Sequence, residues 1–137
     1  MQQSPRERMA KAFKVLVEVS DGTLLSCYAA FGCKLTYTPN QWTSPTLKGS
    51  KLFCFTKLDD AKAFASTIKA FATIAVWKAF ATNIKPCHTV SGYAIPKDIV
   101  AFWDHNPAGY YKGTPPPGTH FADAIMITEE AWRTQNV

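Results

Sequence analysis

Charge and long hydrophobic runs are both scarce in this sequence. Only 18% of the 137 residues are charged, while 47% are hydrophobic and 13% are aromatic. The longest apolar-leaning stretch, residues 63–81, is interrupted by Lys69 and Lys78, so it falls short of the roughly 20 apolar residues that a membrane span needs. Residues 1–11 carry charges, and no apolar core with a cleavage site follows them, so we expect no signal peptide and a cytoplasmic protein.

Motifs that name a reaction are also missing. The sequence has no Cys-x-x-Cys or His-x₃-His pair, and we predict no metal site. It has no Gly-x-Ser-x-Gly turn, glycine-rich phosphate loop or dinucleotide fingerprint. Residues of the types used in nucleophilic catalysis are available, but nothing in the sequence brings them together: Cys87, His88, His120 and Asp123.

The four cysteines do not suggest a disulfide framework. Three of them lie in or beside apolar runs, where a free cysteine behaves as a small hydrophobe, and a cytosolic address disfavours disulfides. We therefore expect all four to be reduced: Cys27, Cys33, Cys54 and Cys87.

Length and hydrophobic patterning predict a single α+β domain over residues 1–137, with residues 1–11 as a flexible lead-in. Residues 12–19 alternate as a strand does, and Asp21-Gly22 is a hairpin turn signal. The pattern predicts a mainly antiparallel sheet of about six strands. We expect strands or short strands at residues 12–19, 23–31, 35–37, 52–55, 73–81, 89–93 and 121–128.

The strongest local signal predicts the main helix over residues 58–71. Apolar residues recur there every three to four positions, and Thr56 with Asp59 resembles a capping box. A short second helix is expected over residues 97–103 after Pro96, and a helical turn from Glu129. The intervening residues 104–120, rich in proline and glycine, are expected to form a long loop.

Positive charge is concentrated in the N-terminal part of the chain. Residues 1–57 contain eight lysines and arginines against three acidic residues, a difference of +5 that equals the net charge of the whole chain. Aromatic residues accompany these cations, and an aromatic ring can stack a base while a cation holds phosphate. The expected binding residues are Arg8, Lys14, Lys34, Tyr37, Trp42, Lys48 and Lys51, with Tyr110 and Tyr111 as a mobile lid.

Plainer interpretations of the same residues stay open. The lysines are equally typical of a solvated face that keeps an apolar protein soluble. Trp42 can fold back to cover the sheet, and Tyr110 and Tyr111 can close a rim.

Short segments along most of the chain resemble small uncharacterised accessory proteins of bacteriophages and giant viruses. The segments are residues 13–15, 25–26, 35–37, 42–45, 52–55, 58–61 and 118–119. The resemblance implies a protein without a cofactor that acts in the host cytosol. It implies sequestration of an anionic nucleotide or nucleic acid, or blocking of a host defence protein.

A second pattern is similar to ADP-ribosyltransferases. Phe55-Thr56, followed by Ala61, Phe64 and Ala65, matches the strand and helix of that kind. This likeness implies an NAD-using enzyme with a catalytic glutamate late in the chain, Glu130 or Glu129. A third hypothesis is a protein-interaction module with no small ligand, and the high hydrophobic fraction also suits a homodimer.

Overall fold

The computed structural model describes residues 9–26, 35–45, 51–68, 73–87, 90–91, 112–113 and 116–134. Antiparallel strands dominate this part of the chain, and α1 (Leu58–Thr67) is its helix. The strands are β1 (Met9–Glu18), β2 (Leu24–Ser26), β3 (Thr36–Tyr37), β4 (Trp42–Thr43), β5 (Leu52–Phe55), β6 (Thr73–Thr82), β7 (Lys85–Pro86), β8 (Val90–Ser91), β9 (Lys112–Gly113), β10 (Thr119–Ala122) and β11 (Ala124–Arg133).

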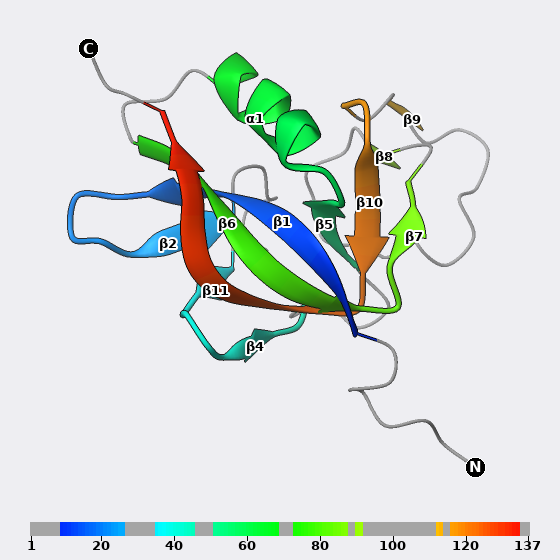
Figure 1. Ribbon diagram of the computed structural model, residues 1–137, viewed down its shortest axis with the longest axis horizontal. Coiled ribbons are helices and arrows are strands. Elements are labelled where there is room, and N and C mark those ends of the chain that lie inside the picture. The colour runs from blue at the N-terminus through cyan, green and yellow to red at the C-terminus, as the bar shows by residue number, and fades with distance from the viewer. Residues whose placement is uncertain are drawn as a thin grey trace.

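Nine strands form the main sheet, whose path runs β4-β11-β6-β1-β5-β10-β7, while β8 and β9 form a separate pair. The long curved strands β1, β6 and β11 lie side by side at its centre (Figure 1). β1 and β6 pair over their whole lengths, from Met9 opposite Thr82 to Glu18 opposite Thr73. β2 pairs with the end of β1 through the turn at Asp21 and Gly22, which confirms the predicted hairpin.

Each face of the central strands buries a different hydrophobic cluster, because successive side chains of a strand point to opposite faces. On one face, Val15 of β1 and Val76 of β6 pack against Ala61 and Ala65 of α1. The opposite face, which we call the inner face, contributes to the larger cluster. That cluster contains Ala12, Leu16, Leu24, Tyr37, Leu52, Cys54, Ala79, Ala81, Ala122, Ile125 and Ile127.

The end of the strand path formed by β10 and β7 joins the pair of β11 and β6 at a bend. β10 and β11 are separated only by Asp123, and β6 and β7 only by Asn83 and Ile84. The pairing of β10 with β7 therefore continues the pairing of β11 with β6 in the same register. Asn83 turns the chain with a φ of 55°, a left-handed conformation that asparagine tolerates better than most residues. One ladder thus crosses the bend and brings β10 alongside β5.

The predicted sheet of about six strands with two helices is wrong, because the main sheet has nine strands and the described residues contain one helix. Several strands, including β3, β4 and β7, are two residues long, which is too short for alternation to be recognised in a sequence. The expected second helix, residues 97–103, lies outside the described residues, as does most of the expected long loop.

The C-terminal prediction fails for another reason. A helical turn was expected from Glu129, but β11 continues to Arg133. Two register shifts against β6, between Ile127 and Glu129 and between Glu130 and Trp132, interrupt the period of two. A strand with such β-bulges loses the alternation that identifies it.

The main helix is confirmed and begins at Leu58 as predicted, although its cap differs from the expectation. Its N-cap is Lys57, and no side chain caps the first turn, so the predicted capping box around Thr56 is wrong. Asp59 and Asp60 do lie in the first turn, where they oppose the positive end of the helix dipole. The helix ends at Thr67, and residues 69–72 lie outside the described part.

Candidate functional site

Four side chains form a row across the sheet, on the face that α1 covers elsewhere. Trp42 of β4 lies opposite Met126 of β11. Met126 in turn lies opposite Phe80 of β6, and Phe80 lies opposite Lys11 of β1. Residues directly opposite in antiparallel strands share one face, so the four side chains project together. We call Trp42, Met126, Phe80 and Lys11 the outer row.

The helix leaves this part of the face uncovered. α1 packs beside Val15 and Val76, further along β1 and β6, whereas β4 lies beside the start of β11 (Figure 1). Trp42 is 43% exposed and is the exposed large hydrophobic residue of the described part of the chain. Phe80 and Met126 are half-buried, and Lys11 is exposed. The outer row therefore combines an accessible indole, a flexible thioether, a second ring and a cation.

The charges next to the outer row largely cancel. Lys78, two residues from Phe80 on β6, pairs with Glu129 of β11, with 3.0 Å between Nζ and Oε1. Lys11 has no carboxylate within ion-pair distance among the described residues. The free positive charge of this surface thus lies at the Lys11 end of the row.

Two of the predicted binding residues, Lys14 and Tyr37, meet on the inner face instead. Lys14 is 8% exposed and Tyr37 is 2% exposed. The Lys14 ammonium lies 5.3 Å from the centroid of the Tyr37 ring and donates a hydrogen bond of 2.6 Å to the carbonyl oxygen of Phe53. The structure therefore pairs a cation with an aromatic ring, as the sequence suggested, but away from the surface.

Trp77 and Cys54 complete the surroundings of Lys14. Trp77 lies directly opposite Lys14 across β1 and β6, and Cys54 is 1% exposed in the same cluster. Burial raises the pKa of the Cys54 thiol to about 11, although the positive charge of Lys14 works in the other direction. Cys54 is therefore a neutral thiol near pH 7. We call Lys14, Tyr37, Cys54 and Trp77 the inner cluster.

Lys51 is engaged at the bend between β10 and β11. Its Nζ lies 2.5 Å from Oδ1 of Asp123, and Asn83 donates a 2.6 Å hydrogen bond to Oδ2. Partial burial disfavours the charged carboxylate, but these hydrogen bonds and the charges of Lys51 and Lys85 outweigh it and lower the pKa of Asp123. Lys51 thus stabilises the fold at this corner.

The other predicted binding residues lie outside the described residues, so the candidate site does not include them. They are Arg8, Lys34, Lys48, Tyr110 and Tyr111. Trp42 is the predicted residue that the outer row contains. Lys11, Phe80 and Met126 were not predicted, since only the pairing of β1, β6 and β11 places them beside Trp42. Alternation along residues 12–19 and 73–81 was the available signal, but the predicted first strand did not include Lys11, which the structure places in β1.

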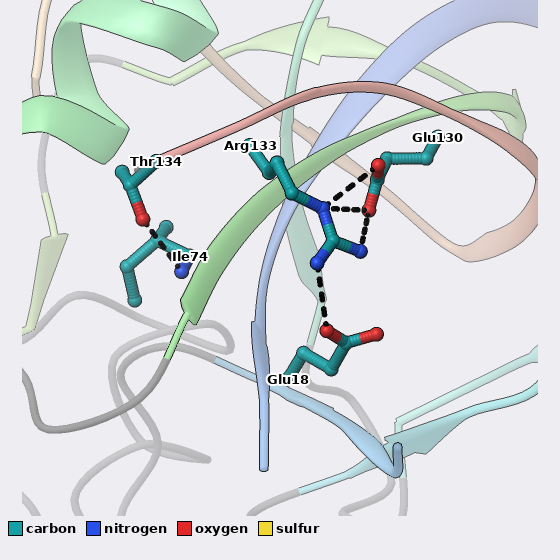
Figure 2. Close-up of polar contacts among 5 residues, drawn as sticks. All are labelled: Glu18, Ile74, Glu130, Arg133 and Thr134. Atoms are coloured by element: carbon teal, nitrogen blue, oxygen red, sulfur yellow. Dashed lines mark hydrogen bonds and ion pairs between the residues drawn. The ribbon is translucent and has the colours of Figure 1, made fainter. Parts of the chain in front are cut away.

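Glu130, the catalytic residue implied by the ADP-ribosyltransferase likeness, lies in an ion-pair cluster near the end of β11. Figure 2 shows the Arg133 guanidinium between the carboxylates of Glu130 and Glu18. Nε of Arg133 lies 2.9 and 3.0 Å from the two Glu130 oxygens. The hydrogen bond with Glu130 raises the pKa of Arg133, although burial opposes the shift. This cluster joins β11 to β1 across β6.

The comparisons give no functional assignment. No protein-family model, no curated protein and no solved structure matches the chain. Within the described residues, no group of three or more histidine, cysteine, aspartate or glutamate side chains is placed to hold a metal ion. No helix in the same part of the chain is long and apolar enough to cross a membrane.

Proposed function

We propose that the protein is a small binding protein that sequesters an anionic nucleic-acid ligand, and that the outer row is its contact surface. The observation that carries this proposal is the exposed ring of Trp42 in one cross-strand row with Phe80 and Lys11. Proteins that bind single strands combine aromatic side chains, on which bases stack, with positive charge that follows the phosphates. Such a role needs no catalytic group, as expected of a virus-type accessory protein.

The length of the outer row favours a single strand over a mononucleotide. Trp42 and Lys11 lie on strands separated by three strand spacings, which is roughly 14 Å along the sheet. A base on Trp42 and a phosphate at Lys11 are then too far apart to belong to one nucleotide. Phe80 and Met126 lie between them and offer a further apolar surface to a second base.

The main competing role, docking of a partner protein by addition of a strand to β11, has less support. In the described part of the chain β4 pairs with β11 only at Ile125 and Met126, so the rest of that edge has no partner strand among the described residues. However, β11 has two register shifts beyond Ile127 and carries Glu129, Glu130 and Arg133 there. Bulges and charges of this kind protect an edge strand from pairing.

Binding of a fluorescent single-stranded oligonucleotide of about ten residues, measured by anisotropy over a range of salt concentrations, tests the proposal. Trp42→Ala is expected to weaken binding roughly 5- to 150-fold, because stacking on one aromatic ring is worth about 1–3 kcal/mol. Lys11→Met is expected to weaken binding and to reduce the slope of log K against log salt by about 0.7, the value for one phosphate contact on a single strand.

Lys57→Met is the matched control, because Lys57 is an exposed lysine at the N-cap of α1, outside the outer row. It is expected to leave both the affinity and the salt slope close to those of the unmodified protein. Absence of binding, or binding that does not depend on salt, would contradict the proposal and point to a protein partner. Release of nicotinamide from NAD that is lost in Glu130→Ala would support the transferase hypothesis instead.

A further inference from the structure

The inner cluster has more hydrogen-bond donors than acceptors. The Lys14 ammonium carries three N–H donors, of which one reaches the carbonyl oxygen of Phe53. The hydroxyl of Tyr37 and the indole Nε1 of Trp77 are both buried without a hydrogen-bond partner among the described residues. Buried polar groups in native proteins nearly always have partners, and an orphaned one costs its full desolvation energy. Within the described part of the chain, this region of the inner face therefore lacks an acceptor.

Charge is unbalanced in the same place. No carboxylate of the described residues lies within ion-pair distance of Lys14 Nζ. The carboxylates of Glu18 and Glu130 bind Arg133, and that of Asp123 binds Lys51. Cys54 stays protonated near pH 7 and supplies no negative charge. A buried ammonium without an anionic partner is costly, so the missing acceptor is best supplied as an anion.

We propose that the inner cluster binds a small monocarboxylate, whose oxygens accept hydrogen bonds from Lys14, Tyr37 and Trp77. Lys14 and Trp77 are directly opposite one another, and the Lys14 ammonium lies over the Tyr37 ring, so the three groups belong to one neighbourhood. One ammonium balances one negative charge, whereas a divalent phosphate leaves an uncompensated charge inside the protein. This site is independent of the outer row, which lies on the opposite face of β1.

The small side chains around Lys14 restrict the ligand further. Ala12 and Ala79, which lie opposite one another one step along β1 and β6 from Lys14 and Trp77, are 2% and 4% exposed. Their methyl groups suit a short apolar tail and offer no hydrogen bonds to a polar one. Formate and acetate are therefore the probes of choice.

The test follows the indole N–H resonances of ¹⁵N-labelled protein during titration with acetate or formate at constant ionic strength, with a bulky sulfonate as the balancing anion. The chain has four tryptophans, and Trp77→Phe identifies the resonance of Trp77. We expect a saturable shift of the Trp77 resonance with either carboxylate. The Trp42 resonance, from the exposed outer row, reports any general effect of the anion at the surface.

The variants decide whether Lys14 and Tyr37 form the site. Lys14→Met is expected to abolish the shift, while Lys57→Met, at an exposed lysine before α1 and outside both candidate sites, keeps it. Tyr37→Phe retains the ammonium and is expected to weaken the carboxylate affinity roughly tenfold or more, the effect of losing one hydrogen bond to a charged acceptor. If Lys14→Met does not fold, the carboxylate affinity of Tyr37→Phe tests the proposal by itself.

A Trp77 resonance that does not shift, or that shifts linearly without saturation, overturns the proposal, because water or another protein group then satisfies the donors. The same conclusion follows if Lys14→Met retains a saturable shift, or if Tyr37→Phe binds the carboxylates as tightly as the unmodified protein. A shift that saturates with the sulfonate alone equally rules out a site shaped for carboxylates.

Discussion

At the scale of single residues, neighbouring lysines of one strand have opposite environments. Lys11 is exposed on the outer row, whereas Lys14, three positions later, is 8% exposed on the inner face. The strand predicted over residues 12–19 begins at Met9 in the structure, and the odd spacing between these lysines then assigns them to different faces. Net charge could not show that one lysine of the basic half is buried, because composition carries no information about faces.

Tyr37 and Trp42 show the same limit for aromatic residues. Both were predicted as binding residues, and the structure buries Tyr37 at 2% exposure while Trp42 stays 43% exposed. The sequence around Trp42 is polar, which left open whether its ring folds back over the sheet, and the structure leaves the ring exposed. Tyr37 lies in a strand of two residues, β3, whose inward face is set by its pairing with β2. That pairing depends on tertiary contacts that local sequence does not encode.

The Asp123 carboxylate predicts a pH dependence at this scale. Its pKa is lowered in the folded protein, so its contribution to stability is present above the pKa of the unfolded chain. That contribution is lost as the pH falls through the folded value. We expect Asp123→Asn to lower the free energy of unfolding near pH 7 by no more than about 1 kcal/mol, because the side chain is 42% exposed. The difference between the two proteins is expected to shrink below about pH 4.

Urea denaturation at several pH values measures this difference. Lys51→Met provides the control, since Lys51 supplies the closest positive charge. In the Lys51→Met protein, Asp123→Asn is expected to have a smaller effect, as a double-mutant cycle will show. If the difference in the free energy of unfolding between the unmodified protein and Asp123→Asn instead grows toward low pH, the proposed role of the Asp123 carboxylate is contradicted.

At the scale of elements, long periodic segments were predictable and short ones were not. β1, β5, β6 and α1 were expected close to their observed positions, because a buried stripe repeats along each of them. β4 and β7 consist of two residues each and exist through their pairing with β11 and β10. The outer row depends on β4, so this candidate site could not be assembled from sequence even though Trp42 was recognised.

The start of α1 offers a stabilising substitution. Lys57 is the N-cap, with the extended φ and ψ of −122° and 133° typical of that position, but its side chain caps no backbone amide. Lys57→Ser is expected to raise the free energy of unfolding by about 0.5–1 kcal/mol, because a serine hydroxyl accepts a hydrogen bond from the first turn.

Thermal and urea unfolding of Lys57→Ser and Lys57→Ala separate capping from the loss of a lysine. Lys57 is exposed, so alanine removes its charge without opening the core. We expect only serine to stabilise the protein. Equal stability of the two variants contradicts a capping effect.

At the scale of the whole molecule, one bend determines how the sheet is arranged. The chain turns at Asn83 and at Asp123, and the pairing of β6 with β11 continues in the same register as the pairing of β7 with β10. The backbone amide of Asp123 also donates a 3.0 Å hydrogen bond to the carbonyl oxygen of Thr82. Nothing in the sequence distinguishes this bend from an ordinary turn, so the order of strands in the nine-stranded sheet could not be predicted.

Asn83 therefore has two roles, which different substitutions separate. It adopts a left-handed φ of 55°, and its amide donates to Asp123. Asn83→Gly keeps the permitted backbone conformation and loses the hydrogen bond, whereas Asn83→Ala loses both. We expect both variants to destabilise the protein, with alanine costing about 1–2 kcal/mol for the left-handed conformation alone.

Asn40, the other asparagine with a positive φ among the described residues, provides the comparison. Its φ is 65°, and its backbone amide donates a 2.8 Å hydrogen bond to the carbonyl oxygen of Ile127, while its side chain makes no hydrogen bond with another described residue. Asn40→Gly is therefore expected to be nearly neutral, whereas Asn83→Gly is not, when both are measured by urea denaturation. If the two glycine variants are equally stable, the Asn83 side chain does not stabilise the bend. Backbone pairing alone then joins β7 and β10 to β6 and β11.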